Sequence, residues 1–289
     1  MKKNNRLYIT LIILVSVLNS CELYNPAEPV PAYIHIDKFT LTTLPDEGTN
    51  SNKITDAWVY VDEQLIGCFE LPATFPVLYE GNHQVRIRAG IKINGIAATR
   101  APYPFFDSYE TSVNMAKGTT ITLKPTVKYF PNTHFDFMEN FDNVGILFAN
   151  SPSGTDTSMQ QIFAATDNNV FEGNGSGIAY LDTARTFFEC VSNTSYILPK
   201  NSAPVFLEFN YKCNHEFVVG LYAHSSTNSY KVAVLTFNSS AEWNKTYLYL
   251  TPVIIGSGNS TDYNIFMGMV NKEGADSLAL VIDNLKLVY

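Results

Sequence analysis

The feature that most constrains the fold is an alternation of side chains with a period of two residues. Between Val85 and Ile93 every odd position is apolar, while the even positions hold Arg, Arg, Gly and Lys. Successive side chains of a β-strand point to opposite faces, so this segment predicts a strand with one buried and one exposed side. The dipeptide Asn94-Gly95 that follows is typical of a tight β-hairpin, and residues 96–99 are expected to begin the return strand.

Most of the chain after residue 32 has the same strand character. Short runs rich in β-branched and aromatic residues alternate with turns of Gly, Asn, Ser and Pro. The runs fall at 33–41, 57–61, 85–93, 96–99, 121–123 and 127–129, and then at 177–182, 186–190, 205–211, 217–223, 230–237, 243–250, 263–270 and 277–289. A turn at Pro131-Asn132 separates the two groups, which predicts two all-β domains: a β-sandwich at 33–132 and a sandwich or jelly roll at 133–289.

The N-terminus has the organisation of an export signal. Three basic residues precede a mostly apolar stretch of 12 residues, Leu7–Leu18, which is shorter than the roughly 20 residues of a membrane span. The sequence Leu18-Asn19-Ser20-Cys21 follows and resembles the lipobox of bacterial lipoproteins. The resemblance implies a signal peptide at 1–20 and acyl chains such as palmitate on Cys21. Cleavage by an ordinary signal peptidase is the alternative.

The lipobox also implies a place in the cell. Residues 21–32 form a Pro-rich tether, and several acyl chains together hold a protein to a bilayer almost permanently. In the bacteria whose lipoproteins this one resembles, several acidic residues just after the lipidated Cys accompany surface display, whereas here only Glu22 is acidic before Glu28. We therefore expect an outer-membrane protein that faces the periplasm, with cell-surface display as the alternative.

Charge and cysteine content narrow the classes of partner. Removal of residues 1–20 takes three positive charges and changes the formal net charge from −8 to −11. Such an acidic body, without a basic stripe, is not expected to bind nucleic acid. Cys21 is assigned to lipid, so Cys68, Cys190 and Cys213 remain. Cys190 and Cys213 lie on two predicted strands. They are expected either to form a disulfide or to be buried as free thiols.

Part of the first half resembles a known class of sandwich. The segments 59–67, 72–76 and 80–87 follow the order of PEGA-like and carboxypeptidase-regulatory-like modules: a hairpin, a bend with proline, and a strand that begins Gly-Asn-His. The usual Gly at the hairpin tip is absent. The resemblance implies an Ig-like fold for 33–132 and a spacer or adhesion role without catalysis.

The ends of the second half resemble jelly-roll carbohydrate-binding modules of the galactose-binding-like group. Glu139-Asn140-Phe141-Asp142 is similar to their opening strand, and the segment 281–287, Val-Ile-Asp-Asn-Leu-Lys-Leu, is similar to their closing strand. The resemblance implies that these two strands pair. It also implies a structural Ca²⁺ held by Glu139, Asp142 and Asp283, since calcium prefers carboxylate and carbonyl oxygens. No other cofactor is expected.

The sequence lacks the motifs of the common hydrolases. The Glu-x-Asp-x-x-Glu strand of retaining β-glucanases is absent, and Gly175-Ser176-Gly177 lacks the Gly-x-Ser-x-Gly spacing. His215-Glu216 is not followed by the second His of a zinc protease. We therefore predict no catalytic residue.

Aromatic residues are the remaining candidates for ligand or partner contact. The segment 101–109 concentrates Tyr103, Phe105, Phe106 and Tyr109 in a predicted loop; packing on the sandwich or on the second domain is the alternative. In the second half the candidate rings are those of Trp243 and Tyr247, with Tyr222, Tyr230 and Tyr249 nearby in the predicted strands.

These observations predict a non-catalytic lipoprotein that acts as a binding or accessory module for envelope proteins. The alternative is a glycan-binding lipoprotein that uses the jelly roll, and a glycoside hydrolase or other enzyme is the third hypothesis. A hollow with an exposed Tyr or Trp beside Asn, Asp or Arg favours glycan, whereas a flat apolar patch favours a protein partner.

Overall fold

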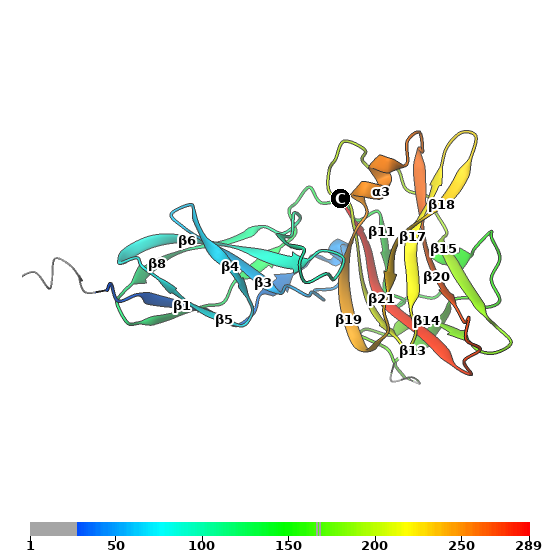
Figure 1. The fold of residues 1–289 in the computed structure, drawn as a ribbon, viewed down its shortest axis with the longest axis horizontal. Coiled ribbons are helices and arrows are strands. Elements are labelled where there is room, and N and C mark those ends of the chain that lie inside the picture. Colours follow the sequence, from blue (N-terminus) through cyan, green and yellow to red (C-terminus); the bar gives the residue numbers. More distant parts are fainter. Residues whose placement is uncertain (1–27, 166, 168) are drawn as a thin grey trace, which may run out of the picture.

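The computed structural model describes residues 28–165, 167 and 169–289, which form two β-sandwiches joined end to side (Figure 1). The lipobox and Cys21 lie outside the described residues. Within the described part of the chain, no helix combines the length and apolarity needed to cross a bilayer. The predicted all-β fold class is confirmed.

The first sandwich consists of the strands β1 to β10. Their bounds are β1 (Ala32–Ile36), β2 (Thr40–Thr42), β3 (Asp56–Val61), β4 (Gln64–Glu70), β5 (Ala73–Val77), β6 (Gly81–Lys92), β7 (Arg100–Pro102), β8 (Ser108–Met115), β9 (Thr120–Leu123) and β10 (Thr126–Lys128). One sheet has the order β4-β3-β6-β7 with β8 also paired to β6, and the facing strands pair as β5-β1-β9 and β10-β2.

The strand predicted at 85–93 corresponds to the second part of β6, which ends one residue earlier, and its apolar side faces the core as predicted: Val85, Ile87, Ala89 and Ile91 are buried. Asn94 and Gly95 both have positive φ, 57° and 70°, as a type I′ turn requires. The return strand predicted at 96–99 is wrong, since β7 begins at Arg100. The hairpin tip instead docks on the second sandwich, where Asn94 N donates to Tyr247 O and Asn94 Oδ1 accepts from Tyr249 N.

The second sandwich has two antiparallel sheets. The strands are β11 (Phe137–Glu139), β12 (Phe148–Asn150), β13 (Gln160–Phe163), β14 (Gly175–Leu181), β15 (Phe187–Ser192), β16 (Phe206–Cys213), β17 (Phe217–His224), β18 (Ser229–Phe237), β19 (Ser240–Tyr249), β20 (Asp262–Val270) and β21 (Leu278–Val288), with a short helix α3 (Thr251–Gly256). The sheet orders are β13-β14-β21-β16-β19, with β11 on β21, and β12-β15-β20-β17-β18. The eight strands predicted here are all present, and the opening strand pairs with the closing one, as expected.

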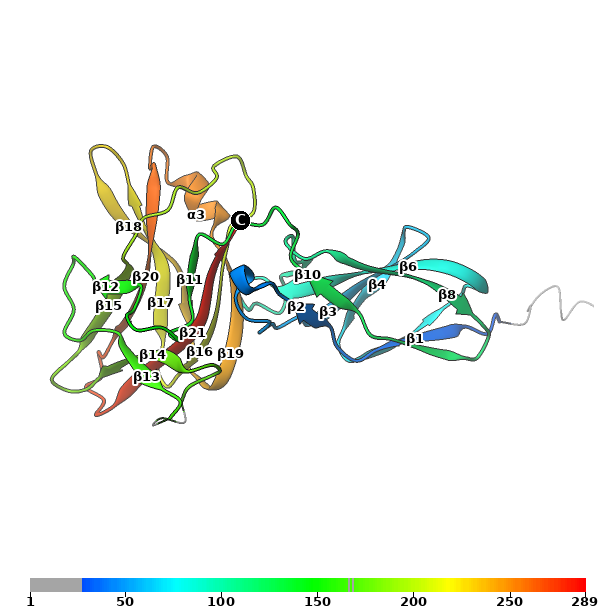
Figure 2. The same cartoon turned by 180° about the vertical axis from the view of Figure 1, so that it is seen from behind.

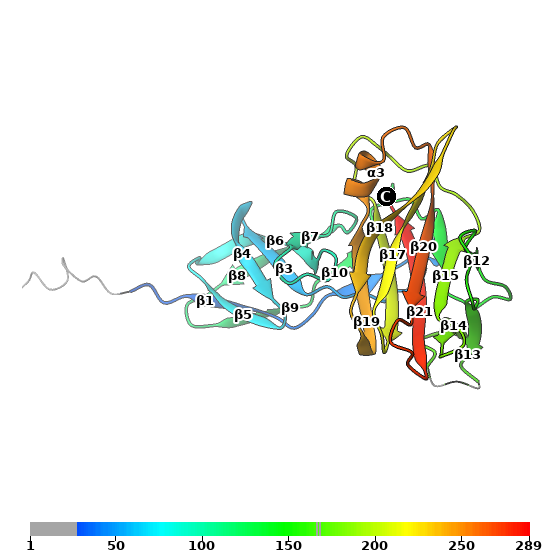
Figure 3. The same ribbon diagram turned by 45° about the vertical axis from the view of Figure 1, so that its right-hand side comes forward.

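The first sandwich packs on the outer face of the sheet that contains β19, β16 and β21 (Figure 1, Figure 3). Side chains from both halves form one apolar cluster. The Tyr103 ring centroid lies 5.3 Å from that of Phe206 and 4.9 Å from that of Tyr247. In Figure 2 the short 3-10 turn η1 (Pro45–Glu47) lies beside β11 and β21. The domain boundary at 132/133 stays a prediction.

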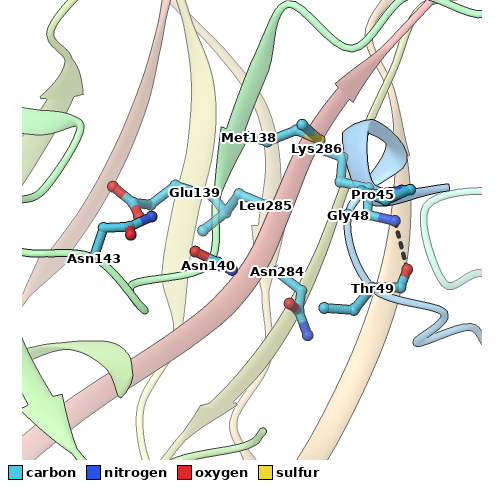
Figure 4. Close-up of a pocket in the computed structure, with 10 residues that line it drawn as sticks. All are labelled: Pro45, Gly48, Thr49, Met138, Glu139, Asn140, Asn143, Asn284, Leu285 and Lys286. Carbon is cyan, nitrogen blue, oxygen red and sulfur yellow. Dashed lines mark hydrogen bonds between the residues drawn. The ribbon is translucent and has the colours of Figure 1, made fainter. Parts of the chain in front are cut away.

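A buried charged cluster lies inside this junction. Glu208 has no exposed surface, and its Oε1 accepts hydrogen bonds from the hydroxyls of Tyr103 at 2.7 Å and Tyr129 at 2.9 Å. Lys245 Nζ lies 3.3 Å from Glu208 Oε2. Lys286 Nζ donates to Thr49 O at 2.7 Å, the contact drawn in Figure 4. These bonds require one particular placement of the two sandwiches.

Candidate functional site

A groove of about 300 Å³ crosses the part of the second sandwich's sheet that the first sandwich leaves uncovered. Its floor comes from the neighbouring strands β14, β21, β16 and β19, which contribute Tyr180, Val281, Lys212 and Ala241 among others. Neighbouring strands are about 4.8 Å apart, so four of them give the groove a span of roughly 14 Å. That length suits an extended ligand that lies across the strands.

Tyr180 is the aromatic side chain of this groove. It pairs in register with Ala279 on β21, and a methyl group there leaves the tyrosine ring uncovered on that side. On its other side β13 pairs with β14 only from Gly175 to Ile178, so the edge strand ends before it reaches Tyr180. Tyr180 is therefore 36% exposed, although the other residues of its strand are buried.

Polar side chains line the groove beside the ring. Lys212 Nζ donates to Asn169 Oδ1 at 3.2 Å. Asn214 is held by the backbone at the start of β21, because its Oδ1 accepts from Ala279 N at 2.8 Å and its Nδ2 donates to O of Ser277, just before the strand, at 3.2 Å. Burial, with a smaller contribution from the charge of Asp167, raises the pKa of Tyr180, so its hydroxyl stays protonated at neutral pH.

The groove has the chemistry of a site that binds small organic molecules. Apolar floor, one exposed aromatic ring and a few fixed amides are the features by which proteins orient a small organic ligand. Among the described residues that line it, there is no carboxylate and no imidazole to act as a general acid or base. The Cys213 thiol is buried, and burial raises its pKa, which suppresses the reactive thiolate.

The structure corrects most of the predicted aromatic contacts. Tyr103, Phe105, Phe106 and Tyr247 are buried in the junction, with 8% exposure or less, so they are not available to a ligand and the packing alternative is correct. Tyr109 is half-buried on β8. Trp243 is also half-buried, and its ring centroid lies 5.0 Å from that of Phe171. Tyr180 could not be singled out from the sequence, because its exposure depends on Ala279, about a hundred residues away.

The three carboxylates predicted to hold calcium do not form a site. Glu139 accepts hydrogen bonds from the backbone N–H groups of Phe141 and Leu147 at 2.8 and 2.6 Å, and in Figure 4 it extends away from Lys286. Asp283 Oδ2 accepts from Ser176 Oγ at 2.7 Å. In the part of the chain that the structure describes, no group of three or more His, Cys, Asp or Glu side chains is arranged to hold a metal ion. Asp142, the third predicted ligand, accepts a hydrogen bond from Asn140 Nδ2.

The three described cysteines are free thiols, so the disulfide between Cys190 and Cys213 is not formed. Both side chains are buried, which agrees with their alternative reading as small apolar residues. Cys68 is on the surface of the first sandwich.

A second polar cluster lies on the opposite sheet of the second sandwich, around the buried Glu189. Its Oε1 accepts from Ser151 Oγ and Tyr222 OH, each at 2.6 Å, and its Oε2 accepts from Lys231 Nζ at 2.7 Å. Burial opposes ionisation of Glu189, but these donors outweigh it and lower the pKa. Because both oxygens are already bonded within the protein, this cluster is better explained as a support for the sheet than as a ligand site.

No family model matches the chain, and no curated protein is similar to it in sequence. Several solved structures are similar to about half of the chain. The family 30 carbohydrate-binding module of a cellulosomal cellulase of Clostridium thermocellum is 14% identical, with 52% of this chain and 89% of that chain covered and a TM-score of 0.34. A family 29 module mutant complexed with mannohexaose is 13% identical (54% and 92% covered, TM-score 0.35). A family 11 module from Clostridium thermocellum is 14% identical (52% and 92% covered, TM-score 0.35).

Proposed function

We propose that this protein is a non-catalytic lipoprotein that binds glycans in the groove at Tyr180. The observation that carries the proposal is the exposed Tyr180 ring beside fixed amide groups on a floor that spans four strands. The C–H face of a sugar ring stacks on an aromatic ring, and amides exchange hydrogen bonds with sugar hydroxyls. This combination matches the criterion that favours glycan over protein partners.

The binding of envelope proteins, which the sequence favoured, has less support from the geometry. Large exposed apolar side chains such as Val144, Ile197 and Leu78 lie in three separate loops. Monomeric proteins commonly expose such residues singly, and only a contiguous patch indicates a partner surface.

The membrane anchor is the second part of the proposal, and it rests on the sequence. Acylation of Cys21 attaches the body to the outer membrane, with its sandwiches in the periplasm; display at the cell surface is the alternative. In either place the anchor keeps the groove near the envelope, where glycan polymers are abundant.

The test is calorimetry of the soluble body, residues 22–289, with neutral oligosaccharides from several plant and cell-wall polymers. We expect binding of at least one of them, and a loss of tenfold or more in affinity, about 1.4 kcal/mol, in Tyr180→Ala. The matched control is Tyr230→Ala, since Tyr230 is 41% exposed on the opposite sheet. Equal losses in both variants, or no glycan binding at all, would overturn the proposal.

A further inference from the structure

A separate cleft of about 370 Å³ lies between the two sandwiches. The first half contributes the hairpin tip at Asn94 and Gly95 together with Lys53, and the second half contributes the turn between β18 and β19 and the start of β19. Among its lining residues are Lys53, Asn94, Gly95, Asn244, Lys245 and Thr246. It shares Ser240 alone with the groove at Tyr180.

The cleft is basic in a protein that is acidic overall. Two lysines line it, and the described residues that form its lining include no Asp or Glu. The charge of Lys245 is balanced by Glu208 behind it, whose Oε2 lies 3.3 Å away. Lys53 forms no ion pair with an acidic side chain in the described part of the chain: its Nζ donates to the neutral Asn244 Oδ1. Partial burial, and then the charge of Lys92, lower the pKa of Lys53, as expected for a cation that lacks a counter-ion.

A buried hydroxyl without a hydrogen-bond partner marks the same place. Thr246 is 3% exposed, and its Oγ1 makes no hydrogen bond to protein. A buried hydroxyl without a partner has lost its hydration, so a ligand group that hydrogen-bonds to it offsets that loss. The hydroxyl faces the hairpin at Gly95, where a Cβ would lie 4.0 Å from Oγ1. The glycine, which the turn requires for its positive φ, also leaves this approach open.

We propose that this cleft binds an acidic sugar residue, a uronic acid or a sulfated sugar, with Lys53 as the counter-ion of its anionic group. Thr246 Oγ1 and the amides of Asn94 and Asn244 are the partners for the hydroxyls of the same sugar. An anion balances the positive charge of Lys53. The many neutral hydrogen-bonding groups of the cleft favour a polyhydroxylated ligand over a bare ion. Both sandwiches contribute contacts, so the site exists only where the junction is intact. It is independent of the Tyr180 groove.

The test uses the 22–289 body and three probes: trigalacturonate, a sulfated disaccharide of the chondroitin type, and neutral galactotriose. We expect calorimetric binding of at least one acidic probe, with little for the neutral one, and an affinity that falls when NaCl is raised from 50 to 500 mM. Lys53→Gln is expected to weaken that binding tenfold or more, and Thr246→Val, which keeps the shape of the side chain, several-fold. The two acidic probes distinguish carboxylate from sulfate recognition.

Two control variants separate this site from others. Lys117→Gln removes an exposed lysine of the first sandwich that does not line the cleft, and it should leave binding unchanged. Tyr180→Ala should also leave it unchanged, so that failure of the groove and failure of the cleft are distinguishable. The proposal is overturned if neither acidic probe binds, if Lys53→Gln with an unchanged melting temperature binds normally, or if Tyr180→Ala abolishes acidic binding.

Discussion

The hydroxyl of Tyr103, in the first sandwich, donates a hydrogen bond to the carboxylate of Glu208, in the second, at 2.7 Å, and both side chains are buried. A carboxylate without access to water is tolerated only when donors and an opposite charge replace its hydration. Tyr129 supplies a second donor, and the ammonium of Lys245 lies 3.3 Å from the other carboxylate oxygen. The contact between the two sandwiches is therefore a specific interface, and substitutions in its polar core test how much it stabilises the fold.

Glu208→Gln is expected to lower the free energy of unfolding by about 3–5 kcal/mol, because it leaves the buried Lys245 ammonium without its counter-charge. Tyr103→Phe removes one donor and should cost less, about 1–3 kcal/mol. Urea denaturation of the 22–289 body measures both. Glu242→Gln, an exposed change on β19, the strand that carries Lys245, serves as the control and should stay within about 0.5 kcal/mol of the wild type. A neutral Glu208→Gln would show that the ion pair does not stabilise the fold.

Stability is expected to pass through a minimum between about pH 7 and 8. Burial raises the pKa of Asp283 to about 7, so the folded state holds this proton more tightly than the unfolded chain, and stability falls as pH rises from about 4 through 7. Burial lowers the pKa of Lys286 to about 8, so its buried charge destabilises the folded state below pH 8. As pH rises from 8 toward 10.5 the folded state loses this proton before the unfolded chain does, and stability increases. Denaturation curves at pH 5, 7.5 and 9.5 measure both the fall and the rise in the free energy of unfolding.

Asp283→Asn tests directly whether ionisation of Asp283 causes the fall in stability between about pH 4 and 7. The amide cannot ionise, so this variant should be more stable than the wild type at pH 7.5, by up to roughly 4 kcal/mol, and should lose most of that advantage at pH 5. Asp276→Asn, at an exposed position, is the control. An advantage of equal size at both pH values would mean that ionisation of Asp283 is not its cause.

Calcium is expected to have no effect on the melting temperature. Both Glu139 oxygens accept backbone hydrogen bonds and Asp283 accepts from Ser176, so the three carboxylates do not converge. A ligand that binds only the folded state must raise the melting point. Melting in 2 mM CaCl₂ and in excess chelator checks this; a lower midpoint in chelator would restore the calcium site implied by the resemblance.

Cys21→Ala is expected to abolish lipidation and leave an uncleaved precursor, because the thiol is both the acylation site and part of the lipobox. Metabolic labelling with palmitate, followed by fractionation of the envelope, measures the result. Ser20→Ala keeps a small residue before the cysteine and should still be labelled. Equal label in Cys21→Ala and the wild type would contradict the anchor.

Strands could be predicted from the sequence because the alternation that defines them is local. The period-two pattern of β6 and the positive φ at Asn94 and Gly95 both follow from neighbouring residues. The burial of Tyr103 does not, because the surfaces that cover it, at Phe206 and Tyr247, are about a hundred residues or more away. The same holds for Tyr180, whose exposure depends on the size of a cross-strand neighbour.

The docking of the hairpin tip has a consequence for solubility. β19 is the last strand of its sheet, and such an edge offers unpaired N–H and C=O groups to any other chain. Asn94 occupies part of that edge, with its backbone on Tyr247 O and its side chain on Tyr249 N. The first sandwich thus occupies part of the edge to which a strand of a second copy would pair, and it protects the second sandwich against edge-to-edge aggregation.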